Sequence, residues 1–293
     1  MSQKRLRLLA VTLVLLLGIA WLAGVFERNP SNIRVPHFEL AADEVNSFTL
    51  ALSADTLEFD RQAGIWYMRR PVSMLADSLT VSRFLSDLAE VTLNTRATSN
   101  PERYGIYGID STAATVTLQM TDESRQITFS QQGRDYSSIF VLLEEDPTVF
   151  STNQRVTVTR DIGRWRDRRV MRTDPATMTS LRVFRPEGDY EVTRGQNSWL
   201  VDGAPADSMQ VTNWLRRFDP LNADGFFDDL PPQVLGDAAY RIEITSRAGT
   251  NSLRGLPHES ALALAAGGGQ FTYRLFESRL DQLFPEAGTL LGE

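Results

Sequence analysis

Apolar and polar side chains alternate in two separate stretches of the chain. The alternation covers residues 48–59 and reaches a further apolar strand at Trp66, and it returns over residues 181–201. A period of two places alternate side chains on one face of a strand. Each stretch is therefore predicted to form a small antiparallel meander.

The period changes from two to three or four directly after each meander. Ala-Asp-Ser precedes both segments, and in the first of them Asp77 or Ser78 can cap the free N–H groups of a helix. We expect one apolar face on each helix. The predicted faces consist of Leu79, Val81, Phe84, Leu85 and Leu88 in the first segment and of Met209, Val211, Trp214, Leu215 and Phe218 in the second.

More alternating stretches follow each predicted helix. Residues 249–261 contain glycine and proline and are predicted to be a surface loop. Together these patterns predict an α+β protein of antiparallel sheets, each with one helix packed across it. The additional strands are predicted at residues 114–120, 126–130, 140–143 and 148–151, and then at 240–246, 262–264 and 271–275.

Two parts of the chain can be aligned with each other. Residues 47–66 match residues 180–199 without a gap at an offset of 133, so Trp66 and Trp199 occupy the same position. The two predicted helix starts also match, at an offset of 130. Such self-similarity indicates two tandem copies of one antiparallel-sheet-plus-helix unit. The predicted units are residues 41–174 (repeat unit 1) and 175–293 (repeat unit 2).

An uncharged apolar segment lies close to the N-terminus. Residues 8–26 form a stretch of 19 residues, close to the roughly 20 that a helix needs to cross a bilayer. Basic residues are concentrated before this segment, so the positive-inside rule places residues 1–7 in the cytoplasm. We predict a signal-anchor transmembrane helix at 8–26 and a juxtamembrane linker at 27–40. The chain would be a single-pass protein of a bacterial inner membrane with a periplasmic C-terminal domain.

A cleaved signal peptide is the alternative interpretation of the same segment. Residues 8–19 also fit the apolar region of a signal peptide, and Gly18-Ile19-Ala20 fits a cleavage site of the small-x-small type. Both interpretations export the residues that follow. Lipid attachment is excluded because the chain contains no cysteine.

Charge and missing residue types exclude several classes of function. The net charge of −7 would repel phosphate backbones, so nucleic-acid binding is disfavoured. Lysine occurs only at Lys4, which leaves no P-loop or Schiff-base lysine after the predicted anchor. The lack of cysteine excludes thiolate nucleophiles and disulfides.

The sequence contains no catalytic or metal-binding motif. His37 lies in the linker and His258 in the predicted loop, each without a motif partner. Residues 222–229 are rich in Asp, but an EF-hand loop here would have Pro220 and Pro231 at its first and last ligand positions. We expect a turn there, with its two phenylalanines packed on the core. No catalytic, cofactor-binding or metal-binding residue is predicted.

The densest charge cluster lies at the junction of the two copies. Residues 160–172 contain six arginines in thirteen residues, together with Trp165. One interpretation is a contact with anionic lipid headgroups or with an acidic partner surface. The other is a linker whose arginines pair with acidic side chains of the two units. The candidate contact residues are Arg164, Trp165, Arg166, Arg168 and Arg169.

The arrangement resembles a family of membrane-anchored proteins, domain-of-unknown-function family 4340. The similarity rests on the Trp66 strand, the approach from Pro71 to Asp77, the helix ending near Leu93, and Tyr107-Gly-Ile-Asp110, and it covers residues 40–285. Residues 235–240 of the second copy lack the Tyr-Gly-Ile-Asp motif. The resemblance implies an association with auxiliary or gliding-type ABC transporter components.

We therefore expect a non-enzymatic accessory protein of the cell envelope. The membrane would hold it through residues 8–26, and its units would bind a protein partner such as an ABC transporter permease complex. No cofactor is expected. Two alternatives stay open, a carboxylate-dependent envelope hydrolase and a periplasmic module that binds a small ligand.

Overall fold

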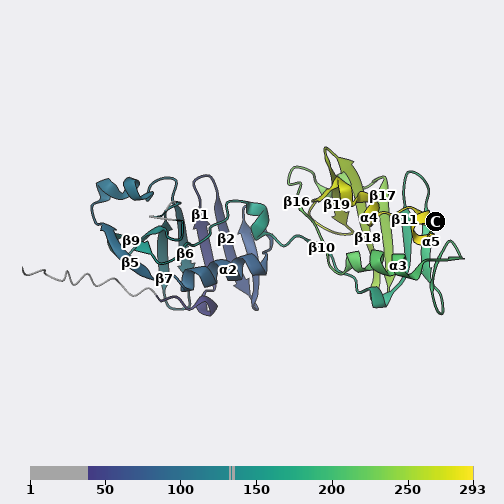
Figure 1. The fold of residues 1–293 in the computed structure, drawn as a ribbon, viewed down its shortest axis with the longest axis horizontal. Helices are drawn as coiled ribbons and strands as arrows, with labels where there is room; N and C mark the ends of the chain where they lie inside the picture. Colours follow the sequence, from purple (N-terminus) through teal and green to yellow (C-terminus); the bar gives the residue numbers. More distant parts are fainter. Residues whose placement is uncertain (1–38, 132, 134–135, 293) are drawn as a thin grey trace, which may run out of the picture. The chain divides into compact units, whose positions relative to one another are not determined.

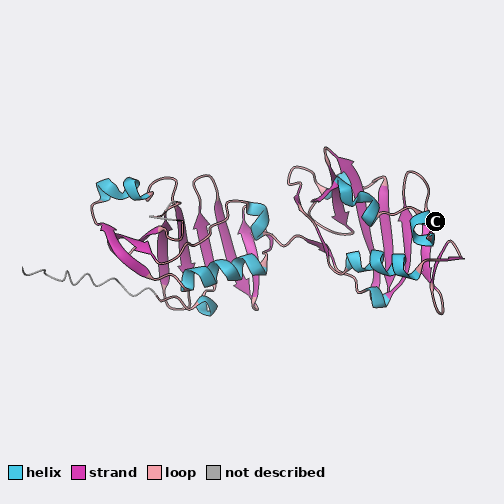
Figure 2. Cartoon of the chain, in the orientation of Figure 1, coloured by secondary structure: helices cyan, strands magenta, loops and turns pink. Residues whose placement is uncertain are grey.

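The computed structural model describes residues 39–131, 133 and 136–292. These residues form two large antiparallel sheets with few helices (Figures 1 and 2). The predicted transmembrane helix at 8–26 and most of the predicted linker lie outside the described residues. Within the described residues, no helix has the length and apolar character needed to span a membrane.

The first large sheet has nine strands in the order β4-β3-β2-β1-β6-β7-β8-β9-β5. The meander predicted around residues 48–66 provides β1 to β3, and the later strands extend the sheet from β1. The strands are β1 (Ser47–Ala51), β2 (Thr56–Gln62), β3 (Ile65–Arg70), β4 (Met74–Leu75), β5 (Leu93–Thr98), β6 (Ala114–Gln119), β7 (Ser124–Phe129), β8 (Phe140–Leu143) and β9 (Asp146–Thr152).

The second large sheet repeats this arrangement strand for strand. Its order is β14-β13-β12-β11-β17-β18-β19-β20-β16, and a separate pair, β10 (Arg169–Met171) with β15 (Leu221–Asn222), lies outside it. The strands are β11 (Met178–Phe184), β12 (Tyr190–Arg194), β13 (Trp199–Val201), β14 (Ala204–Pro205), β16 (Gly225–Phe226), β17 (Tyr240–Ser246), β18 (Gly249–His258), β19 (Ala261–Ala266) and β20 (Tyr273–Phe276).

The helices follow the same plan. In each half of the chain, one helix follows the fourth strand in sequence and precedes the strand that forms the far edge of the sheet. An aspartate caps each of them, since Asp77 accepts a hydrogen bond from the N–H of Thr80 and Asp207 accepts from those of Met209 and Gln210. The α-helices are α2 (Ser78–Ala89), α3 (Ser208–Leu215), α4 (Leu280–Leu283) and α5 (Ala287–Leu291).

Short 3-10 helices complete the secondary structure. One precedes β6 and one precedes β17, at equivalent places in the two sheets. They lie at Ala42–Glu44, Pro101–Tyr107, Ile162–Trp165, Pro175–Thr177, Arg216–Phe218, Pro232–Leu235 and Glu277–Arg279.

The contacts within the chain divide it into two compact units, whose bounds differ from those of the predicted repeat units. Unit 1 contains the described residues up to Asp60 and Ser82–Val158, and unit 2 contains Arg61–Val81 and Thr159–Glu293. The boundary that the sequence places between residues 174 and 175 stays a prediction.

Strand register supports the alignment of the two copies. Leu50 lies opposite Leu57 in the first sheet, and Val183 lies opposite Tyr190 in the second. Both pairs are related by the offset of 133 that the sequence predicts. Equivalent residues therefore occupy equivalent places in the two sheets.

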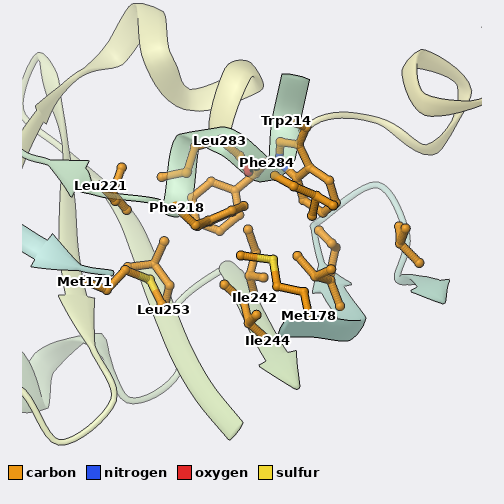
Figure 3. Packing of buried hydrophobic residues seen from close by; sticks show 14 of the residues in the cluster. Met171, Met178, Trp214, Phe218, Leu221, Ile242, Ile244, Leu253, Leu283 and Phe284 are labelled. Atoms are coloured by element: carbon orange, nitrogen blue, oxygen red, sulfur yellow. Dashed lines mark hydrogen bonds between the residues drawn. The ribbon is translucent and has the colours of Figure 1, made fainter. Parts of the chain in front are cut away.

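The core of the second sheet lies between its strands and helices α3 and α4. Figure 3 shows side chains from both helical segments, Trp214, Phe218 and Leu283, facing strand residues such as Ile242 and Leu253. Trp214 and Phe218 meet edge to face at 5.7 Å, a favourable geometry for aromatic rings. Burial of this apolar face is the main stabilising contribution to the unit.

Two predictions from the sequence are wrong in this structure. Residues 249–258 form β18, a strand inside the sheet, where a loop was predicted. Leu79 and Met209 are 58% and 68% exposed, although both were predicted to lie on the apolar helix face. The reason is helical geometry: each side chain lies two residues, or about 200°, from the buried Val81 or Val211.

Candidate functional site

The arginine-rich segment is held by backbone hydrogen bonds within unit 2. The N–H of Asp77 donates to the carbonyl of Trp165 at 2.8 Å, and the N–H of Asp167 donates to the carbonyl of Leu75 at 3.0 Å. Trp165 is fully buried, and its indole N–H donates to the carbonyl of Thr159. The segment is thus an ordered connection whose side chains have fixed positions.

Arg166 is the buried cation of this segment, with 2% of its surface exposed. Its Nη1 donates to both carboxylate oxygens of Asp228, at 2.7 and 2.9 Å. Its guanidinium lies 3.5 Å from the ring centre of Phe226, and its Nε lies 2.9 Å from the sulfur of Met74. Its Nη2 has no hydrogen-bond partner among the described residues. Ion pairing and ring contact compensate most of the cost of burying this charge.

The five predicted contact residues divide into two groups. Trp165 and Arg166 are buried, whereas Arg164, Arg168 and Arg169 are exposed. Arg164 lies 3.6 Å from Asp161 and Arg169 lies 2.8 Å from Asp167. A contact with an acidic surface stays a prediction, and in this structure only the three exposed arginines are placed to make it.

A cavity of about 700 Å³ lies in unit 2. Asp228, the partner of Arg166, belongs to its wall. Phe227 and Phe271 provide apolar surface, while Arg254 and Thr272 contribute polar side chains. Its size is that of a pocket for a small organic molecule.

Gly267 and Gly268 form the turn that leads from β19 to this wall. A Cβ at Gly267 would lie 2.3 Å from the hydroxyl oxygen of Ser252, and Gly268 has a φ of +72°. Rotation of the Ser252 hydroxyl would relieve the contact at Gly267, whereas the positive φ at Gly268 favours glycine. Gly268 is therefore the position of this turn where the backbone conformation beside the cavity favours glycine.

Arg254 is the half-buried cation of the cavity wall, and its charge lacks a partner. Its Nε is inaccessible and has no hydrogen-bond partner, and the described residues provide no hydrogen bond or ion pair to its side chain. Arg241 lies directly opposite it on β17. Arg241 is compensated by the ring of Phe184 at 3.7 Å and by Glu243 at 3.5 Å. Like charges facing each other across a sheet are unfavourable.

Thr272 adds a second polar group without a partner. Its side chain is 3% exposed, and its hydroxyl oxygen has no hydrogen-bond partner in the described part of the chain. Its backbone carbonyl accepts from the N–H of Phe227. Its neighbour Tyr273 has a raised pKa because the phenol is buried, and Asp167 adds to the rise. Burial therefore disfavours the ionised form of Tyr273, which belongs to the main core and not to the cavity wall.

Other residues considered in the sequence have structural roles. His258 ends β18 and meets Phe227 edge to face at 5.0 Å, so it lies in a strand where a loop was predicted. Phe226 packs on the main core, as predicted. Asp110 of the Tyr-Gly-Ile-Asp motif accepts hydrogen bonds from the N–H and hydroxyl of Thr112, which lower its pKa. Within the described residues, no cluster of three or more His, Asp or Glu could hold a metal ion.

Comparison with known proteins gives one match. A family model described as a domain of unknown function, DUF4340, matches residues 66–238. The chain belongs to this family. The match contains the Trp66 strand, both α2 and α3, and the Tyr107 motif on which the resemblance rested. No curated protein and no solved structure matches the chain.

Sequence reasoning missed the polar wall of the cavity. Arg254 lies in the segment that was predicted to be a loop, and Thr272 carries no motif. The signal emerges when strand register extends the comparison of the two copies, because it places Thr115 and Thr128 of the first sheet where Arg241 and Arg254 stand in the second. A neutral-to-charged difference between the copies is a better guide than any local pattern.

Proposed function

We propose that the chain is an accessory protein of a bacterial envelope that binds a protein partner and has no enzymatic activity of its own. Residues 8–26 would anchor it in the inner membrane, with residues 1–7 in the cytoplasm and the two sheets in the periplasm. An ABC-type transport complex is the partner class that the proposal names. The two sheets would be the products of one duplicated unit.

The observation that carries this proposal is a pair of equivalent apolar side chains that face solvent. Leu79 is the second residue of α2 and Met209 is the second residue of α3, and both are more than half exposed. A second pair of exposed apolar side chains also occupies equivalent positions in the two copies. Ile106 and Val234 are each the second-last residue of the 3-10 helix before β6 or β17, with 76% and 54% exposed.

An exposed apolar side chain alone is ordinary on a protein surface. Its recurrence at two equivalent positions in both copies favours a repeated contact, because other exposed residues of the two helices differ, such as Arg83 in α2 and Asn213 in α3. Replacing such a side chain with a small polar one removes apolar area that a partner would bury. The proposal therefore assigns Leu79 and Met209 to a partner surface.

Crosslinking in native membranes followed by mass spectrometry tests this assignment. We expect the double variant Leu79→Ser, Met209→Ser to lower partner recovery by roughly tenfold or more, since burial of two such side chains contributes a few kcal/mol and about 1.4 kcal/mol corresponds to tenfold. Ile65→Ser is the matched control, because Ile65 is 48% exposed and its equivalent in the second copy is Ser198. Unchanged recovery of permease or ATPase subunits with the double variant would contradict the proposal.

The anchor is tested separately. The mass of the mature protein from membranes distinguishes an intact N-terminus from a chain that begins at Trp21. A chain that begins at Trp21 would replace the anchor with a cleaved signal peptide, and export would be retained.

A hydrolase is the alternative from a different class. Its best starting point is Asp87, whose carboxyl pKa is raised by burial and, to a smaller extent, by Glu90. Neither residue belongs to the wall of the cavity. Loss of an envelope hydrolase activity in Asp87→Asn would favour this alternative over the accessory role.

A further inference from the structure

The cavity in unit 2 combines an apolar wall with polar atoms that have no hydrogen-bond partner among the described residues. Buried polar groups in proteins are nearly always hydrogen-bonded, so each exception calls for an explanation. The described residues contain four such exceptions, and two of them are Arg166 Nη2 and Arg241 Nε. The other two, Arg254 Nε and Thr272 Oγ1, belong to residues of the same wall. Their coincidence at one cavity points to a ligand that supplies the missing partners.

The charges around the cavity indicate which ligand would fit. Arg166 is neutralised by Asp228 through two hydrogen bonds, and Arg241 is balanced by Glu243. Arg254 keeps its positive charge, because no acidic side chain of the described residues forms an ion pair with it, and Asp228 of the same wall is paired with Arg166. One uncompensated cation matches one negative charge, and the planar guanidinium suits an oxyanion with two acceptor atoms.

The first sheet provides an internal comparison. At the positions of Arg241 and Arg254 it carries Thr115 and Thr128, whose hydroxyl groups bond to each other at 3.0 Å. The fold therefore does not need arginine at these positions. Two adjacent cations in the second sheet are costly for stability, which favours a binding role for the one that lacks compensation.

We propose that this cavity binds a small organic monoanion, a carboxylate attached to an apolar body. Arg254 is its counter-ion, Thr272 donates a hydrogen bond, and the rings of Phe227 and Phe271 contact the apolar part. Both atoms are inaccessible as the structure stands, so the proposal requires the Arg254 and Thr272 side chains to rotate toward the ligand. The site is independent of the partner surface at Leu79 and Met209.

Saturation-transfer NMR on the full chain in a nonionic detergent tests the proposal. The probes are benzoate, phenyl phosphate, benzyl alcohol and benzylamine, which share a ring and differ in charge. We expect benzoate to bind more tightly than phenyl phosphate and much more tightly than the neutral and cationic probes. Empty micelles of the same detergent correct for partition.

Variants assign the binding to the cavity. Arg254→Gln should weaken benzoate binding by roughly tenfold or more, and Thr272→Val by about threefold, as expected for one charged and one neutral hydrogen bond. Arg254→Lys should retain part of the affinity because it keeps the charge without the planar fork. Arg182→Gln is the matched control, since Arg182 lies on β11 of the same sheet and outside the cavity wall.

Three results would overturn the proposal. They are no saturation transfer to benzoate at millimolar concentration, equal binding of benzoate and benzyl alcohol, and equal benzoate affinity of Arg254→Gln and Arg182→Gln. Thr272→Val keeps the test valid if Arg254→Gln does not fold, because the valine is nearly isosteric with threonine.

Discussion

The two sheets differ most clearly where the second holds the C-terminal segment. Three positions that carry apolar residues in the first copy carry side chains with hydrogen-bond donors in the second. Their donors bond to the carbonyls of three consecutive residues, Leu283, Phe284 and Pro285. The equivalent pairs are Leu52 and Arg185, Leu57 and Tyr190, and Phe84 and Trp214.

This comparison shows how a duplicated unit acquires a new packing partner. In the first sheet Leu57 and Phe84 contribute only apolar surface, and Phe48 stacks on Phe59 at 4.4 Å. In the second sheet the backbone after α4 is brought into the core and its carbonyls need donors. Arg185, Tyr190 and Trp214 supply these donors. The second sheet therefore keeps the strand order of the first, while a different segment of the chain packs against it.

Arg185→Leu, which restores the residue type of the first sheet, should have the largest effect on this difference. Arg185 is 8% exposed, bonds to the carbonyl of Phe284, and lies near Glu187, Asp281 and Glu286. We expect a loss of about 1.5–3 kcal/mol in the local free energy of unfolding, as for hydrogen bonds to charged groups. Hydrogen–deuterium exchange of residues 280–291 measures it.

Arg182→Leu is the control for that change, because Arg182 is exposed on β11, three residues before Arg185. Faster exchange at residues 280–291 in both variants, or in neither, would show that the C-terminal segment does not depend on Arg185. Exchange in β1 to β9 should stay unchanged in both.

Tyr190→Phe should have a smaller effect. It removes one hydrogen bond, from the phenol to the carbonyl of Pro285 at 2.7 Å, and keeps the ring in place. We expect a loss of about 0.5–1.5 kcal/mol near neutral pH. Tyr136→Phe is the control at a side chain that is 97% exposed, and an equal loss there would contradict the assigned role of Tyr190.

The same tyrosine predicts the alkaline behaviour of the second sheet. Burial raises the pKa of Tyr190 above its ordinary value of 10.0, so the folded state keeps the phenol neutral where the unfolded chain ionises. Its stabilising contribution is complete below pH 10 and decreases as the pH rises above that value. The free energy of unfolding should fall less steeply above pH 10 in Tyr190→Phe, whereas the same slope in both proteins would contradict the prediction.

Sequence periodicity predicted most strands and both main helices, because alternation and three-to-four spacing reflect local geometry. It failed at β18, where Gly255 and Pro257 resembled loop residues. A Cβ at Gly255 would lie 3.1 Å from the ring of Phe284, so this glycine serves close packing. That contact joins residues far apart in sequence, and no local pattern contains it.

The candidate site was less predictable than the fold for the same reason. The arginine cluster was visible in sequence, but burial of Arg166 depends on Asp228 and Phe226, more than fifty residues away. Arg254 belongs to no motif, and its significance comes from the acids that are absent around it in the described residues. For both Arg166 and Arg254, the role of the arginine depends on whether residues distant in sequence neutralise its charge.

The smallest predicted change in stability concerns Arg241 and Arg254, which face each other in the second sheet. It tests directly how the second sheet differs from the first. The double variant Arg241→Thr, Arg254→Thr gives the second sheet the threonine pair of the first. We expect its free energy of unfolding without ligand to rise by about 0.2–1 kcal/mol, because two facing cations are replaced by a cross-strand hydroxyl pair.

Chemical denaturation with and without benzoate measures both consequences of this variant. The wild-type protein should gain stability from benzoate by mass action, whereas the double variant should start higher and gain nothing. Stability that falls in the double variant would mean that the arginines support the sheet through their contacts with Phe184 and Glu243. In that case the difference between Thr128 and Arg254 would reflect packing, and the comparison of the two sheets would no longer point to a ligand.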